Sequence, residues 1–242
     1  MKINFEKLNT VAIYAAAISI VILILFASIQ LNAFNRDFYK STYEELKTSK
    51  ILGMTKKDLN RSTTILLDYL EDNRDDIKLE VVVQGKKMQA FNAKETAHMV
   101  DVKNLYQSAI AVAQVAGGIF VLSVGYLFIR LKKGAFTVLS IGYIKVAILA
   151  GAFLLMLAGW AYVDFDAFWT AFHEVLFRND LWLLDPYTDL MINLFPAAFF
   201  SKMIFRIVLS FAVCFGVLFT GSYVYLRHEL KKLTEEELNY EE

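Results

Sequence analysis

The sequence predicts a mostly α-helical membrane protein with four transmembrane helices. Three observations favour this class. The composition is 57% hydrophobic and 14% aromatic, whereas an average soluble domain has about 45–50% apolar residues. Four apolar runs are each long enough to cross a bilayer, which takes about 20 mostly apolar residues. Lys and Arg cluster in the short segments that flank these runs. The formal net charge is zero, so the composition predicts no nucleic-acid partner.

The four apolar runs divide the chain into spans and connecting segments. The first run, 11–31, exceeds the core of a signal peptide and lacks a following small-residue cleavage site, so we expect an uncleaved span. The second and third runs, 108–129 and 136–163, are separated by the basic loop 130–134, and the fourth run is 204–226. The expected regions are 1–31 (N-terminus and first span), 32–107 (extracellular domain), 108–163 (second and third spans), 164–203 (extracellular interfacial stretch) and 204–242 (fourth span and tail).

Basic residues set the predicted orientation. They occur at the N-terminus (Lys2 and Lys7), in the loop 130–134 and after the fourth run (Arg227). These three places lie on one side of the membrane if there are four spans, and the positive-inside bias makes that side cytoplasmic. Both termini are then cytoplasmic, and the two longer connecting segments face outward. Long loops are largely exempt from the bias, so the mixed charges of 32–107 do not oppose this orientation.

The segment 32–107 has the pattern of a small α+β domain. Thr55 followed by Asp58 is typical of a helix start, and the leucines that follow recur on one helical face: Leu59, Leu66, Leu67 and Leu70. Two β-prone runs, 78–83 and 86–91, flank a Gln-Gly dipeptide and predict a hairpin. From Asn92 a helical pattern continues directly toward the second span.

The stretch 172–200 is rich in aromatic residues and Leu, but it cannot cross lipid as one helix. Charged side chains interrupt it at intervals: Glu174, Arg178, Asp180, Asp185 and Asp189. Pro186 and Pro196 indicate further breaks. We expect short amphipathic pieces at the membrane surface, with Trp182 and Tyr187 at the depth of the headgroups. An ordinary loop between two spans is the alternative, so the functional interpretation depends on His173.

Two of the three histidines are candidates for catalysis. His98 lies about ten residues before the second run, and His173 lies about ten residues after the third, both on the predicted outer side. Glu95, His98 and Asp101 are spaced by three residues and therefore share one helical face. His228 lies beside basic residues on the cytoplasmic side, where we expect a solvated helix end. For each histidine, an exposed side chain without a function is the competing interpretation.

Other catalytic signals are lacking in the sequence. There is no GxSxG motif, and the single cysteine, Cys214, lies in the middle of an apolar run, where we expect it to be buried at lipid depth. The sequence therefore predicts neither an enzyme nucleophile nor a disulfide framework. We expect no cofactor and no metal ion.

The two histidine segments resemble a known family, the lipoprotein intramolecular transacylases (Lit) of low-GC Gram-positive bacteria. The resemblance is carried by His98-Met99-Val100-Asp101-Val102 and by Phe172-His173, Phe177, Trp182, Asp185-Pro186, Asp189, Phe195-Pro196 and Phe199-Phe200, and it covers the whole topology. It implies an acyltransferase of the bacterial cell membrane with its active site at the outer face. The implied substrate is a diacylated lipoprotein within membrane lipid. The implied reaction moves the sn-2 acyl chain of the diacylglyceryl group to the α-amine of the N-terminal cysteine, giving a lyso-form lipoprotein.

Histidine acid–base chemistry suits such a transfer. An α-amine has a pKa near 7.7–8.0 and is largely protonated at neutral pH, whereas a histidine with a pKa near 6.5 can accept its proton. We therefore expect His98 and His173 to be catalytic, and one of them to return a proton to the leaving glycerol oxygen. Asp101 or Asp185 could orient a ring nitrogen. The candidates for donating a hydrogen bond to the oxyanion are Arg178, Asn179, Trp182 and Tyr187.

Two other classes of function remain open at this stage. Two histidines with nearby carboxylates could bind Zn²⁺ with one position open for water, as in a metal-dependent membrane hydrolase, although no HExxH motif occurs. A non-catalytic membrane scaffold or sensor is the other alternative, in which the segment 32–107 binds a protein and the histidines have no chemical role.

Overall fold

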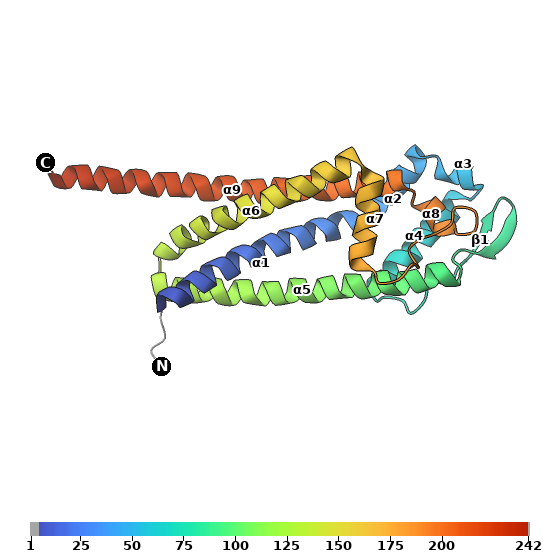
Figure 1. Cartoon of the computed structure of the whole chain (residues 1–242), viewed down its shortest axis with the longest axis horizontal. Helices are drawn as coiled ribbons and strands as arrows, with labels where there is room; N and C mark the ends of the chain where they lie inside the picture. Colours follow the sequence, from blue (N-terminus) through green and yellow to red (C-terminus); the bar gives the residue numbers. More distant parts are fainter. Residues whose placement is uncertain (1–4, 242) are drawn as a thin grey trace. The chain divides into compact units, whose positions relative to one another are not determined.

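The computed structural model describes residues 5–241, with side chains described from residue 6 to residue 236. Lys2 of the predicted basic N-terminus lies outside the described residues. Figure 1 shows helices and one two-stranded sheet, which are, in chain order, α1 (Phe5–Ala33), α2 (Arg36–Glu45), α3 (Thr48–Leu52), α4 (Lys56–Leu70), β1 (Glu80–Val83), β2 (Lys86–Gln89), α5 (Ala93–Leu131), α6 (Gly134–Val163), α7 (Phe165–Leu176), α8 (Leu190–Leu194) and α9 (Ala197–Glu241).

The chain divides into two compact units. One, the span unit, contains the described parts of 1–28, 112–158 and 208–242. The other, the domain unit, contains 29–111 and 159–207. The two predicted outer segments thus share one unit rather than forming two separate ones. Each of the four longest helices, α1, α5, α6 and α9, contributes residues to both units.

Four helices among the described residues are long and apolar enough to cross a membrane: α1, α5, α6 and α9. The prediction of a mostly α-helical protein with four transmembrane helices is confirmed. The helix α5 has 39 residues, a length of about 58 Å at 1.5 Å per residue, whereas a hydrocarbon core is about 30 Å thick. The first part of α5, before the apolar run 108–129, therefore lies beyond the membrane-spanning segment.

Small side chains dominate the buried positions of the span unit. The buried alanines are Ala12, Ala16, Ala17, Ala113, Ala116, Ala135 and Ala147. Gly142 of α6 marks a close approach to α1, because a Cβ atom added there would lie 2.2 Å from Cγ2 of Ile13. The hydroxyl of Tyr143 donates a hydrogen bond of 2.9 Å to the carbonyl oxygen of Phe215. Small residues that let helix backbones approach are typical of packing within membranes.

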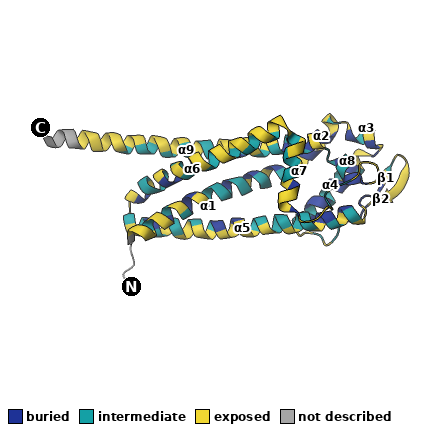
Figure 2. Ribbon diagram, in the orientation of Figure 1, coloured by how far each residue is buried: buried dark blue, intermediate teal, exposed yellow. Residues whose placement is uncertain are grey.

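The domain unit has a core of large side chains. Phe38, Tyr39 and Tyr43 of α2 pack against Phe199 near the start of α9, with ring centroids 5.2–5.8 Å apart. Figure 2 shows buried positions on α2, α4 and α8 of this unit. The core joins the two predicted outer segments, because α2 belongs to the first and the start of α9 to the second.

The helix and the hairpin that local sequence signals predict in 32–107 are present in the structure. Thr55 caps α4, and its hydroxyl accepts a hydrogen bond from the backbone N–H of Asp58. The hairpin is antiparallel with Val81 opposite Met88, and its strands are shorter than the predicted runs. Gln84 and Gly85 between the strands have φ angles of 49° and 76°, the paired positive values of a type I′ turn.

The stretch 172–200 is broken as predicted. The helix α7 begins at Phe165, immediately after its cap residue Asp164, and ends at Leu176. Turns then lead to the single helical turn α8 and to Pro196, immediately before α9. The backbone N–H groups of Thr188 and Asp189 donate to the carbonyl oxygen of Asp185, so the chain around Pro186 is a tight turn.

Candidate active site

His98 and His173 are brought together within the domain unit. His98 lies in the first part of α5, and His173 lies near the end of α7. Their ring centroids are 6.2 Å apart, and only 7% of His98 and 9% of His173 is exposed. Two histidines from distant parts of the chain therefore share one buried cluster, as the predicted pair required.

The ring of His173 is held in one orientation. Its Nδ1 lies 2.7 Å from the backbone carbonyl oxygen of Trp169, one helical turn earlier. A carbonyl oxygen only accepts hydrogen bonds, so Nδ1 must carry the proton and Nε2 keeps its lone pair. Trp182 stacks on the ring with centroids 4.9 Å apart, and Trp169 meets it edge to face at 4.7 Å. His173 is thus a fixed, neutral base with one free nitrogen.

His98 has a different environment. Phe177 meets its ring edge to face, with centroids 5.2 Å apart. Its Nδ1 is buried and has no hydrogen-bond partner among the described residues. Such an unpaired group typically costs about 1–3 kcal/mol, and a polar atom of a ligand would relieve that cost.

Burial favours the neutral form of both histidines. Burial is the main cause that lowers the pKa of His98 to about 4; the nearby His173 lowers it too, and the Asp101 carboxylate acts in the opposite direction. Burial also lowers the pKa of His173, against the hydrogen bond to the Trp169 carbonyl, which raises it. A neutral imidazole can accept a proton at one nitrogen and donate a hydrogen bond from the other.

A buried carboxylate, that of Glu95, lies one helical turn before His98 near the start of α5. The carboxylate of Glu95 accepts a hydrogen bond of 2.7 Å from the backbone N–H of Asn92, whose side chain accepts one of 3.0 Å from the backbone N–H of Glu95. This reciprocal pair is a capping box. The other oxygen of Glu95 accepts a bond of 2.6 Å from the backbone N–H of Met191. Asn92 also donates to Asp189 at 2.7 Å, so the start of α5 is tied to α8 and its preceding turn.

The other predicted site residues have distinct positions. Trp182 joins the histidine cluster, as its stacking on His173 shows. The amide of Asn179 donates to the carboxylate of Asp101 at 2.9 Å. Asp185 accepts a hydrogen bond from the backbone N–H of Tyr187 and so stabilises a turn. Tyr187 is 97% exposed.

The structure corrects one expectation about the site. We expected a carboxylate, Asp101 or Asp185, to orient a ring nitrogen, but for His173 the orienting group is the Trp169 carbonyl. This carbonyl lies one helical turn earlier on the same helix. Cys214 is exposed on the protein surface of α9, within a helix able to cross a membrane. Arg178 is exposed as well, in the irregular segment that follows α7.

Several residues of the cluster were missed at the level of sequence. Trp169 precedes His173 by one helical turn and also stacks on Phe200, with centroids 4.5 Å apart. Phe177 contacts both histidine rings. Aromatic residues are common throughout this stretch, so their type alone did not distinguish these two. Glu95 was placed on the helical face of His98 but was given no role in the site. The spacing of Asn92 and Glu95 is also a signal of a capped helix start.

No group of three or more His, Cys, Asp or Glu side chains among the described residues is arranged to hold a metal ion. His228 lies exposed on α9 in the span unit, whereas the histidine cluster belongs to the domain unit.

The fold and the buried histidine cluster define a multi-pass, α-helical membrane protein with a compact domain that carries a candidate acid–base pair. The sequence profile of the lipoprotein intramolecular transacylase Lit matches residues 14–200. The chain therefore belongs to the Lit family and is a transacylase, an enzyme of the acyltransferase class.

Solved structures agree with this assignment at the level of the fold. A structure of the membrane integral lipoprotein intramolecular transacylase Lit from Bacillus cereus has a TM-score of 0.73 at 23% identity, covering 94% of this chain and 99% of that one. Two variants of the same protein, with a histidine replaced by arginine or by alanine, have TM-scores of 0.69 and 0.71. The arginine variant is 22% identical to this chain, and the match covers 96% of this chain and 96% of the variant. The alanine variant is 21% identical, and the match covers 94% of this chain and 97% of the variant. No curated protein sequence matches the chain.

Proposed function

We propose that this enzyme moves the sn-2 acyl chain of a diacylated lipoprotein to the α-amine of the lipoprotein's N-terminal cysteine. The amine nitrogen attacks the ester carbonyl carbon, a C–N bond forms, and the bond from that carbon to the glycerol oxygen breaks. One proton leaves the amine and one proton reaches the glycerol oxygen, so the reaction is balanced without a cofactor or a water molecule. The product is a lyso-form lipoprotein with an N-acyl chain.

The observation that carries this proposal is the buried pair of histidines, with Nε2 of His173 unprotonated. His173 accepts the amine proton at Nε2 and delivers a proton to the departing glycerol oxygen. The two aromatic rings against His173 keep its orientation fixed during both steps. Since amine and ester belong to one molecule, the enzyme gains mainly by holding them in attack geometry.

His98 has a complementary role in this proposal. Its low pKa makes it a weak base, but a neutral imidazole is a suitable hydrogen-bond donor to an ester oxygen that becomes negative. The unpaired Nδ1 is the atom that the substrate would engage. Asp101, one helical turn after His98, places a negative charge near the pair and favours the approach of the substrate ammonium group.

A positionally labelled substrate tests the reaction directly. The purified enzyme is incubated with a synthetic diacylated lipopeptide whose sn-2 chain carries an isotope label. We expect mass spectrometry to find the label on the N-terminal amide and the mass of the lipopeptide to be unchanged. Release of labelled free fatty acid would instead indicate a hydrolase, and a lipopeptide that remains unaltered would contradict catalysis on this substrate class. A chelator should leave the transfer rate unchanged; inhibition would favour the metal-dependent alternative.

The proposed orientation places the domain unit on the outer face and both termini in the cytoplasm. It is supported by the basic loop between α5 and α6 and by the positive-inside bias. In a Cys214→Ser background, Lys56→Cys should react with an impermeant thiol reagent on intact cells, and Lys132→Cys should react only after lysis. The reverse pattern would place the histidines in the cytoplasm and contradict the proposed orientation.

A further inference from the structure

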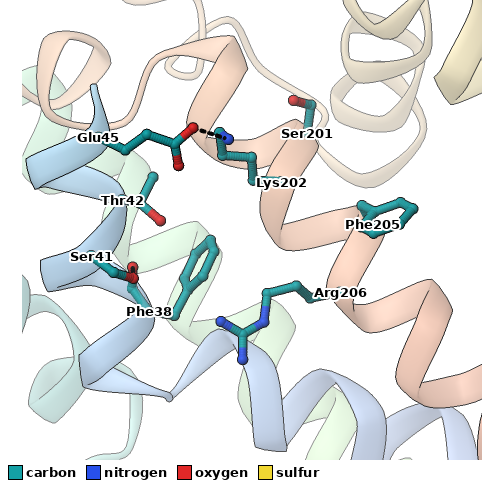
Figure 3. A pocket seen from close by; sticks show the side chains of 8 residues that line it. All are labelled: Phe38, Ser41, Thr42, Glu45, Ser201, Lys202, Phe205 and Arg206. Carbon is teal, nitrogen blue, oxygen red and sulfur yellow. Dashed lines mark hydrogen bonds and ion pairs between the residues drawn. The ribbon is translucent and has the colours of Figure 1, made fainter.

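A polar pocket of the domain unit lies apart from the histidine cluster. Its volume is about 410 Å³, within the range of about 300–1,000 Å³ typical of small-molecule sites. Figure 3 shows side chains from α2 and from the start of α9 around it. The lining residues are Phe38, Ser41, Thr42, Glu45, Ser201, Lys202, Phe205 and Arg206. None of the residues that contact the two histidines lines this pocket.

The charges around the pocket do not cancel. Lys202 forms an ion pair of 2.7 Å with Glu45, as the dashed line in Figure 3 shows. Arg206, one helical turn later on α9, has no carboxylate within ion-pair distance among the described residues. Its guanidinium lies over the ring of Phe38, 5.0 Å from the centroid. The pocket therefore contains two cations and one anion, and the planar donor group of Arg206 is left without an anionic partner.

Arg206 is exposed near the point where α9 enters its apolar run. The apolar run 204–226 begins beside it, and the adjacent Phe205 is 67% exposed. A long cationic side chain near the end of a membrane span reaches toward the headgroups rather than into the hydrocarbon. Arginine binds phosphate oxygens through two parallel hydrogen bonds, and basic pockets between helices at the membrane surface recognise phospholipid headgroups.

We propose that this pocket binds the phosphate group of an anionic glycerophospholipid of the surrounding bilayer. Arg206 holds the phosphate, and the hydroxyl of Thr42 in the lining donates a further hydrogen bond. The hydroxyl of Ser41 already donates to the carbonyl oxygen of Phe38. Exposed Phe205 contacts the acyl chains. A lipid at this position joins α2 to the start of α9 and so stabilises the domain unit. The diacylglyceryl anchor of the proposed substrate carries no phosphate, so the ligand differs from the substrate and the inference does not depend on the proposed reaction.

The experiment uses the full-length protein, purified and delipidated in neutral detergent. Mixed micelles contain phosphatidylglycerol or phosphatidylcholine, and a separate sample contains inorganic phosphate alone. Native mass spectrometry counts bound lipid, and the midpoint of thermal unfolding measures stabilisation. We expect phosphatidylglycerol to be retained and to raise the midpoint more than phosphatidylcholine does. An equal effect of the two lipids would overturn selection by charge, and an equal effect of inorganic phosphate would overturn the assignment to a lipid.

Three variants distinguish a specific loss of lipid binding from general damage to the fold. Arg206→Gln should weaken phosphatidylglycerol binding by about tenfold, the typical effect of losing a hydrogen bond to a charged group. Glu45→Gln should strengthen it by about threefold, because it removes the anion that competes for Lys202. Arg61→Gln is the matched control, since Arg61 lies on α4 and pairs with Asp58 outside the pocket. The proposal is wrong if Arg206→Gln binds as Arg61→Gln does, or if Glu45→Gln weakens binding.

Discussion

The domain unit and the span unit bury different kinds of side chain. In the domain unit, large aromatic and aliphatic residues pack on one another, and Phe199, Leu59 and Leu194 are at most 1% exposed. In the span unit, the buried positions are mostly alanine, while large side chains such as Leu122, Leu149 and Leu155 are at least 74% exposed. Lipid removes the need to bury apolar groups, so the span unit is stabilised by close backbone approach. The domain unit has a core of its own, and the histidines of this unit lie among further aromatic rings.

The largest effect that we expect concerns the histidines of the domain unit. His98→Ala and His173→Ala should each lower the rate of acyl transfer by about 10²–10⁴-fold, the usual contribution of a general acid or base. The double variant should be little worse than either single one, because the two residues act as a unit. The rates are measured by mass spectrometry on the lipopeptide, and the midpoint of thermal unfolding serves as the folding control. Retained activity in His98→Ala would show that His173 acts without this partner.

A matched pair of phenylalanine substitutions tests the contrast between the cores. Phe199→Ala removes a ring that is 0% exposed in the domain unit and should lower the free energy of unfolding by about 3–5 kcal/mol. Phe153→Ala removes a ring that is 56% exposed on α6 and should cost less than about 1 kcal/mol, because lipid or detergent replaces its contacts. Unfolding is followed in one detergent at one lipid content. Similar losses for both variants would mean that the two units are stabilised in the same way.

The sequence predicted the features that depend on interactions between residues close together in the chain. The helix start at Thr55, the turn at Gln84 and the broken stretch 172–200 are local effects of residue type, and they were predicted correctly. The apolar runs likewise predicted four helices able to span a membrane. At the site, the sequence predicted His98, His173 and Trp182 as members. It contained no signal for the distance of 6.2 Å between the two histidine rings.

Long-range packing and backbone groups account for what was missed. The ring of Phe38 lies 5.3 Å from that of Phe199, and this contact merges two segments that the sequence presents as separate. Periodicity shows which face of a helix is apolar but not which other element covers it. The orienting group of His173 is the carbonyl of Trp169, and every residue has a carbonyl, so no residue type could indicate it.

A smaller effect should accompany a fall in pH. The folded-state pKa of His98, about 4, lies below the ordinary value of 6.5. The unfolded chain therefore binds a proton first, and stability is lost as the pH falls from about 6.5 to about 4, with no contribution from His98 above that window. The lowered pKa of His173 acts in the same direction, and the raised pKa of Glu95 acts against it. His98→Asn should show a weaker dependence of the unfolding midpoint on pH. An unchanged dependence would assign the loss to other groups.

Two glycines of the span unit should respond to alanine in opposite directions. Gly142→Ala would place its Cβ 2.2 Å from Cγ2 of Ile13, and this atom belongs to a β-branched side chain that cannot easily rotate away. We expect a loss of about 1–3 kcal/mol in the free energy of unfolding. No atom lies within 4 Å of a Cβ added at Gly118, so Gly118→Ala should gain up to about 1 kcal/mol from helix propensity. Thermal unfolding of both variants tests these expectations. A gain in stability for Gly142→Ala would contradict close packing of α1 against α6.

The smallest expected effect belongs to the third histidine. His228 lies exposed on α9 in the span unit, without the aromatic neighbours that fix His173. His228→Ala should therefore change the rate of acyl transfer by less than about twofold, in line with the small effects typical of exposed positions. The rate is measured with the same lipopeptide as for His173→Ala. The two variants then differ only in whether the imidazole is removed from the span unit or from the domain unit. A loss as large as that of His173→Ala would mean that the chemistry is not confined to the domain unit, and the division of roles between the two units would have to be abandoned.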